Sequence, residues 1–158
     1  MKDFKNEKNL NFNIGVAYNP YLKNHYNICG ERERIKKKFS CRLTKSIWLQ
    51  FGTDIKLLEK EINFLNDSVL NNTSHSKDKN VKIFGSLLIP SKEFISRFKF
   101  RPWKGVFISE KYLNSLDDFY AFTKDLIEIY LDNNICPIIE TECSSIKKLQ
   151  DIHSLMKR

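Results

Sequence analysis

Short apolar segments alternate with amphipathic segments along most of this chain, and this alternation limits the folds that the sequence can adopt. The apolar segments are rich in β-branched and aromatic residues, and the segments between them carry apolar residues at helical spacing. Strands are predicted over 12–18, 47–51, 81–89, 105–108 and 135–139, and helices over 31–39, 55–66, 91–98, 115–133 and 144–156. Strands that alternate with helices favour a parallel sheet with right-handed crossovers.

The length of the chain limits how many of these units it can hold. A complete (βα)8 barrel takes about 250 residues, whereas this chain has 158. The sequence therefore predicts an α/β fold whose parallel (βα) units form a small open sheet or part of a TIM barrel. We expect the polar residues 1–10 to be a flexible N-terminus and residues 11–158 to be a single domain.

One junction between a strand and a helix stands out in residues 46–54, Ser-Ile-Trp-Leu-Gln-Phe-Gly-Thr-Asp. The amide of Gln50 lies where the predicted strand ends, and Asp54 lies where the next helix begins. Asp54 is therefore a predicted N-cap. In parallel α/β folds such junctions are where ligands bind, so the sequence predicts a ligand site here.

Composition narrows the classes of function and the compartment. The formal net charge of +8 is compatible with nucleic-acid binding, but the lysines are interleaved with acidic residues, so charge alone does not favour it. The sequence shows neither a transmembrane helix nor a secretory signal, and the four cysteines form no CxxC pair. These features indicate a cytoplasmic protein. The sequence offers no metal-ligand spacing, no Ser/His/Asp set and no Gly-rich phosphate loop.

Several segments, in order, resemble the C-terminal half of a methylenetetrahydrofolate reductase, a (βα)8 barrel flavoenzyme of one-carbon metabolism. Residues 14–20, Ile-Gly-Val-Ala-Tyr-Asn-Pro, are similar to a strand of that family that ends in a Tyr-Pro or Asn-Pro turn. Residues 31–38 resemble the helix that follows it. Residues 50–54 resemble the family's Thr-Gln-x-Phe-Phe-Asp signature, and residues 135–139 resemble the strand that would close the barrel.

This resemblance implies a substrate, cofactors and site residues. In the family the glutamine binds the pterin of a reduced folate, which points to Gln50, with Asp54 beside it. An amide suits a pterin edge because it offers a donor and an acceptor together. Enzymes of this type pass a hydride from NAD(P)H through FAD to 5,10-methylenetetrahydrofolate. The resemblance assigns the flavin to four residues of this chain: Asn19 near the isoalloxazine, Glu31 near the ribose, Arg34 on the same face, and Lys38 near the pyrophosphate.

The sequence also departs from the family's pattern. Gly52 and Thr53 replace the two phenylalanines of the signature, and the segment between the predicted helix over 31–39 and the predicted strand over 47–51 is one residue longer. The family's first four (βα) units, which hold its catalytic glutamate, have no counterpart here, so no catalytic residue can be assigned. Activity would need the missing half barrel, supplied by self-association or by a partner chain.

Other interpretations of the same residues stay open. Gln50 is compatible with an ordinary polar strand end, and residues 31–38 with a solvated outer helix. Residues 101–104, Arg-Pro-Trp-Lys, are expected to form a turn pinned by a buried Trp103, although stacking on a pterin or base is an alternative. Glu140 and Glu142 end the last strand, where polar ligands bind. The whole chain could instead be a non-catalytic binding or scaffold module, or a basic RNA-associated protein.

Overall fold

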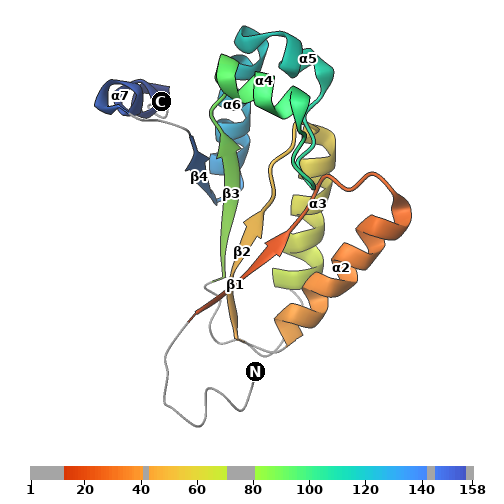
Figure 1. The fold of residues 1–158 in the computed structure, drawn as a ribbon. Coiled ribbons are helices and arrows are strands. Elements are labelled where there is room, and N and C mark those ends of the chain that lie inside the picture. The colour runs from red at the N-terminus through yellow and green to blue at the C-terminus, as the bar shows by residue number, and fades with distance from the viewer. Residues whose placement is uncertain (1–12, 41–42, 71–80, 142–144, 156–158) are drawn as a thin grey trace.

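The computed structural model describes residues 13–40, 43–70, 81–141 and 145–155. Four parallel strands form one sheet in the order β1-β2-β3-β4, so neighbours in the sheet are also neighbours in sequence. Helices connect them (Figure 1). The elements are β1 (Ile14–Tyr18), α2 (His25–Ser40), β2 (Thr44–Leu49), α3 (Ile55–Leu65), η1 (Asn66–Leu70), β3 (Lys82–Leu88), α4 (Lys92–Phe100), α5 (Glu110–Asn114), α6 (Leu116–Asp132), β4 (Ile135–Glu140) and α7 (Ile146–Leu155).

The strand register sorts the side chains onto two faces. Val16, Ile47, Ile83 and Ile135 lie side by side across the whole sheet, and the three isoleucines are buried. The next residue along each strand points to the opposite face, because side chains alternate along a strand. That second row is Ala17, Trp48, Phe84 and Cys136. A slip of one residue would exchange the two rows, so the β-branched pattern fixes the register.

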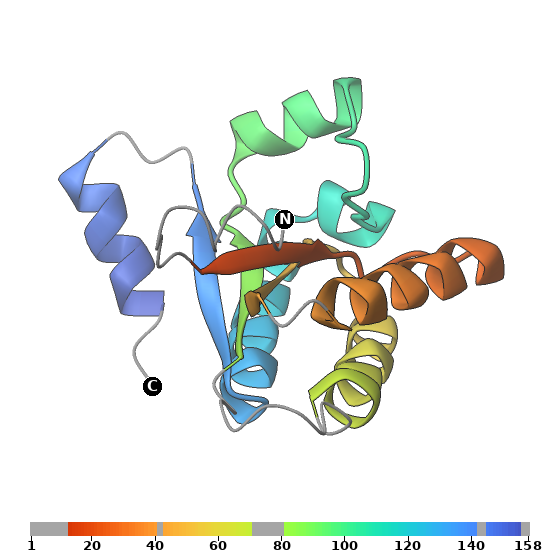
Figure 2. The same ribbon diagram turned by 90° about the horizontal axis from the view of Figure 1, so that it is seen from below.

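The hydrophobic core lies on the face of the isoleucine row. Helices α2, α3 and α6 lie together on that side of the sheet, whereas α7 lies apart beyond β4 (Figure 2). Leu58, Ile62 and Leu65 of α3 and Phe119 and Leu126 of α6 are buried there. Their helical spacing is the one that the sequence showed.

A buried polar cluster ties α2 and α3 to β1. The Tyr18 hydroxyl donates to Glu61 Oε2 at 2.5 Å, and Arg32 donates to both Glu61 oxygens at 2.9 and 2.6 Å. The Arg32 guanidinium also lies 4.4 Å from the centre of the Phe64 ring. Burial, followed by the hydrogen bond to the Glu61 carboxylate, raises the pKa of Tyr18 well above its usual 10.0. Glu61 is only 1% exposed, and this cluster satisfies both of its oxygens.

Most predicted helix starts are confirmed. Asp54 accepts a hydrogen bond from the Leu57 amide, Ser91 from that of Phe94, and Ser115 from that of Asp118. Ser109 precedes α5 without such a bond. The predicted start of α2 at residue 31 is wrong, since the helix begins at His25 and contains Gly30. The reason is Asn24, whose side chain accepts from the Tyr26 amide at 2.9 Å and provides an earlier cap.

The predicted strand over 105–108 is also wrong. Only an isolated bridge links Phe107 to Gly52, and β4 occupies the position beside β3. The segment is short and begins at Gly105, whose φ of +86° is not a strand conformation. It forms a loop over the end of β2. The expectation of a flexible segment over 1–10 concerns residues outside the described ones.

Every described helix is too short or too polar to cross a lipid bilayer.

Candidate functional site

The face of the sheet opposite the core carries exposed aromatic and polar side chains. Trp48 is 46% exposed, and its ring lies 4.9 Å from that of Phe84, centre to centre. A Cβ on Gly15 would lie 2.5 Å from Trp48 Nε1, so the absence of a side chain there lets the indole lie across β1. Parallel sheets are normally covered on both faces. This aromatic surface is therefore available for a ligand or a partner.

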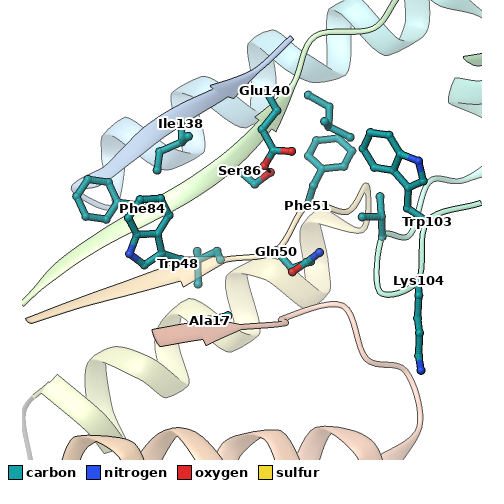
Figure 3. A pocket seen from close by; sticks show the side chains of 13 residues that line it. Ala17, Trp48, Gln50, Phe51, Phe84, Ser86, Trp103, Lys104, Ile138 and Glu140 are labelled. Carbon is teal, nitrogen blue, oxygen red and sulfur yellow. Dashed lines mark hydrogen bonds between the residues drawn. The ribbon is translucent and has the colours of Figure 1, made fainter. Parts of the chain in front are cut away.

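A cavity of about 310 Å³ lies on this face at the carboxyl ends of the strands. Its floor is formed by Trp48, Phe84 and Ile138, and the loop after α4 contributes Trp103 and Lys104 as a wall. Its polar side chains include Gln50, which directly follows β2, and Ser86 and Glu140, which lie in β3 and β4 (Figure 3). A few polar groups among apolar ones is the usual make-up of a small-molecule site.

Gln50 is the polar group at the end of β2. Its backbone amide donates to the Tyr18 carbonyl at 2.9 Å, which holds this residue beside β1. Its side-chain amide lies in the cavity (Figure 3) and makes no hydrogen bond to another described residue. Gln50 therefore offers an unused donor and an unused acceptor to whatever enters.

Ser86 and Glu140 form a second polar group, held from behind by α6. The Ser86 hydroxyl donates to Glu140 Oε1, and the Tyr130 hydroxyl donates to the Ser86 carbonyl at 3.1 Å. Burial raises the pKa of Tyr130 above its usual value, so the phenol keeps its proton as the donor. A Cβ on Gly85 would lie 2.4 Å from Tyr130 Cζ, so only glycine lets this ring approach the strand.

The wall of the cavity is anchored at several points. Asn19 donates to the Gly105 carbonyl at 2.9 Å, and the Thr53 amide donates to the Phe107 carbonyl at 2.9 Å. Trp103 packs edge-on against Phe94 at 5.5 Å, centre to centre. The prediction of a buried Trp103 is wrong, because 46% of the residue is exposed and it lines the cavity. Stacking of a ligand on Trp103 was only the alternative prediction from the sequence.

The four residues assigned to a flavin lie around the end of β1 and along α2. Glu31 is 7% exposed, accepts from the Asn19 amide at 3.0 Å and pairs with Arg34. The Asn19 side chain accepts from the Tyr21 amide at 3.0 Å and donates to Gly105. Lys38 lies further along the helix, where its ammonium approaches the Ala17 carbonyl at 3.4 Å. Asn19, Glu31 and Arg34 thus meet, and Lys38 lies apart.

Asp54 does not share the cavity of Gln50. Its carboxylate caps α3 by accepting from the Leu57 amide at 3.2 Å. It lines a second cavity, of about 370 Å³, together with Thr53, Tyr112 and Ser109. The structure thus separates the two residues that the resemblance placed together at the substrate. Among the described residues no group of His, Cys, Asp and Glu is arranged to hold a metal ion.

Comparison with known proteins gives a match at the level of the fold. Searches of family models and of curated protein sequences give no significant match. Among solved structures, an uncharacterized protein from Clostridium thermocellum, described as binding two copies of 5-methyl-5,6,7,8-tetrahydrofolic acid, has a TM-score of 0.61 and 20% sequence identity. The alignment covers 98% of this chain and 56% of that one, so the chain spans about half the length of its structural neighbour. At this identity the likeness shows a shared fold.

Proposed function

We propose that this protein binds a reduced folate in the cavity at the carboxyl ends of β2, β3 and β4. The observation that carries the proposal is the side-chain amide of Gln50, which has no partner among the described residues and lies beside the aromatic floor of the cavity. The similarity in fold to a protein described as binding 5-methyltetrahydrofolate supports the choice of ligand. Both observations agree with the ligand that the resemblance of residues 50–54 implies.

The chemistry of the cavity suits a pteridine ring. A flat heterocycle stacks on half-exposed aromatic side chains, which Trp48, Phe84 and Trp103 supply. Its edge alternates hydrogen-bond donors and acceptors, which an amide satisfies in pairs. Each such bond contributes about 1 kcal/mol, so Gln50 would add orientation as well as affinity.

The remainder of a folate is anionic, and the chain is basic. Lys104 is exposed at the wall of the cavity, and its side chain extends away from the aromatic floor (Figure 3). A glutamate tail that leaves the cavity on this side would meet its ammonium group. The net charge of +8 would favour the approach of such an anion over long distances. A folate would therefore suit this basic chain without requiring a nucleic-acid partner.

We further propose that the four (βα) units are half of a (βα)8 barrel. The strands are parallel and in sequence order, which is the arrangement of consecutive barrel strands. β1 and β4 both end the described sheet as edges, and exposed edges invite pairing. Self-association or a partner chain would supply the other half. Sedimentation at micromolar concentration should show a dimer, and a monodisperse monomer would contradict self-association.

Hydride transfer through FAD from NAD(P)H stays a prediction from the resemblance alone. In this structure Asn19 and Glu31 form hydrogen bonds within the chain, so a flavin bound there would replace or share those bonds. The activity that we propose from the cavity is ligand binding. Flavin absorbance in the purified protein, with turnover of NAD(P)H, would favour a reductase instead.

A titration with 5-methyltetrahydrofolate tests the proposal. Both tryptophans of the chain line the cavity, so their fluorescence should change on binding. In Gln50→Ala the loss of two hydrogen bonds should weaken binding by about 10- to 100-fold, with unfolding free energy within about 0.5 kcal/mol of the parent. Gln150→Ala, which removes the exposed amide of α7, is the matched control. Unchanged affinity in Gln50→Ala would overturn the assignment of Gln50.

A further inference from the structure

Glu140 is a second polar group in the cavity, and the proposed role of Gln50 leaves it unexplained. It is the last residue of β4 and lies opposite Leu88 of β3 in the sheet register. Its carbonyl accepts from the Ile89 amide at 3.1 Å, which fixes the backbone at this point. The side chain lies on the open face and lines the cavity with Ser86 (Figure 3).

The carboxylate of Glu140 is oriented but only partly satisfied. Oε1 accepts from the Ser86 hydroxyl, and the Ser86 backbone is in turn held by the Tyr130 hydroxyl at 3.1 Å. Oε2 makes no hydrogen bond to another described residue. Tyr130, Ser86 and Glu140 thus form a chain of bonds from the buried helix α6 to the cavity, and its free end is an acceptor.

An ionised carboxylate accepts hydrogen bonds and donates none. Its natural partner is a group with two parallel N–H donors, as in the fork that arginine presents to carboxylates. A 2-amino-4-oxo-pyrimidine presents the same fork, made by N3–H and the 2-amino group. This is the distal edge of a pterin, and it is absent from a 2,4-dioxopteridine, which has a carbonyl oxygen at position 2.

We propose that Glu140 reads the N3–H and 2-amino edge of the pterin and makes the site selective for 2-aminopteridines. The proposal rests on the proposed function and adds a specificity-determining residue to it. One strand separates β2 from β4, so their backbones are about 10 Å apart at the usual strand spacing. Gln50 and Glu140 can therefore reach two different edges of one bicyclic ring lying over Phe84.

The substitution Glu140→Gln gives a sharp test, because it changes the hydrogen-bonding groups of this side chain and keeps its shape. Glutamine offers one acceptor and one donor, which no longer match two donors but do match N3–H beside a 2-oxo group. Pterin and lumazine, its 2,4-dioxo counterpart, should each compete with bound 5-methyltetrahydrofolate. Calorimetry then gives the affinity of each compound. The parent should prefer pterin by about tenfold or more, and Glu140→Gln should lose or reverse that preference.

Two controls keep the failures distinguishable. Glu128→Gln removes the same charge from an exposed position of α6 and should leave the preference unchanged. Ser86→Ala should weaken the preference less than Glu140→Gln does, because it only frees the carboxylate to rotate. If Glu140→Gln binds folate with the parent's affinity and preference, the role of Glu140 is overturned while that of Gln50 stands. If the parent binds neither folate nor pterin, both proposals fail.

Discussion

The two faces of the sheet differ in whether their polar side chains have hydrogen-bond partners. Beneath the sheet, Glu61 is buried and both of its oxygens are bonded to Tyr18 and Arg32. On the open face, the Gln50 amide has no partner among the described residues, and Glu140 is bonded through one oxygen. Buried polar groups that are fully satisfied specify a structure, whereas unsatisfied ones in a cavity are available to a ligand. The difference separates the residues that hold this fold from those proposed to use it.

The largest expected effect is on the covered face. Glu61→Ala leaves the Tyr18 hydroxyl and the Arg32 guanidinium without their shared acceptor, and should lower the free energy of unfolding by about 3 kcal/mol. Urea denaturation, monitored by circular dichroism, measures this free energy. Glu59→Ala, on the exposed side of the same helix, should change it by less than about 0.5 kcal/mol. If both substitutions lowered the free energy of unfolding equally, the buried cluster would contribute no more to stability than an exposed residue does.

Alkaline pH should weaken the same cluster. Because the pKa of Tyr18 is raised above 10.0 in the folded protein, the unfolded chain loses this proton first as the pH rises through 10. The unfolded state then binds fewer protons, so stability falls above pH 10, by about 1.4 kcal/mol per pH unit for each such tyrosine. Urea midpoints measured across this range should fall less steeply in Tyr18→Phe. Parallel slopes for the two proteins would argue against a raised pKa of Tyr18.

The smallest effect is expected at Arg34, which pairs with Glu31 on the same helix that carries Arg32. The Arg34 side chain is 66% exposed, against 26% for Arg32. Solvent screens such a pair, so Arg34→Ala should cost about 0.5 kcal/mol or less. Glu31 also keeps its hydrogen bond from the Asn19 amide. A loss as large as that of Glu61→Ala, in the same urea assay, would contradict this ranking of the two ion pairs.

Local signals in the sequence predicted much of the fold. The β-branched residues of the strands and the capping residues of the helices are local signals, so they could be recognised without a structure. The caps are Asp54, Ser91 and Ser115. The start of α2 was predicted too late, because the cap that Asn24 provides earlier in the chain was not recognised. The short segment 105–108 had the composition of a strand, but strand pairing depends on distant neighbours.

The site was only partly predictable for the same reason. Gln50 was found from its place at a strand-to-helix junction, which is a local feature. Ser86 and Glu140 are 54 positions apart in the sequence, so their pairing depends on the register of β3 and β4. The separation of Asp54 from Gln50 depends on the loop that ends at Ser109 and divides their cavities. The alternation of Phe84, Ser86 and Leu88 along β3 was the one available signal for that part of the cavity.

The most direct test is to map the ligand onto the two faces by magnetic resonance. Isotope-labelled protein should be titrated with 5-methyltetrahydrofolate while its amide and indole N–H signals are followed. We expect shifts at both tryptophan indoles, the Gln50 side-chain amide and the Ser86 and Glu140 amides, with Leu58, Glu61 and Leu126 on the covered face unchanged. Shifts centred instead on Asp54 and Tyr112, or none at saturating folate, would contradict the account.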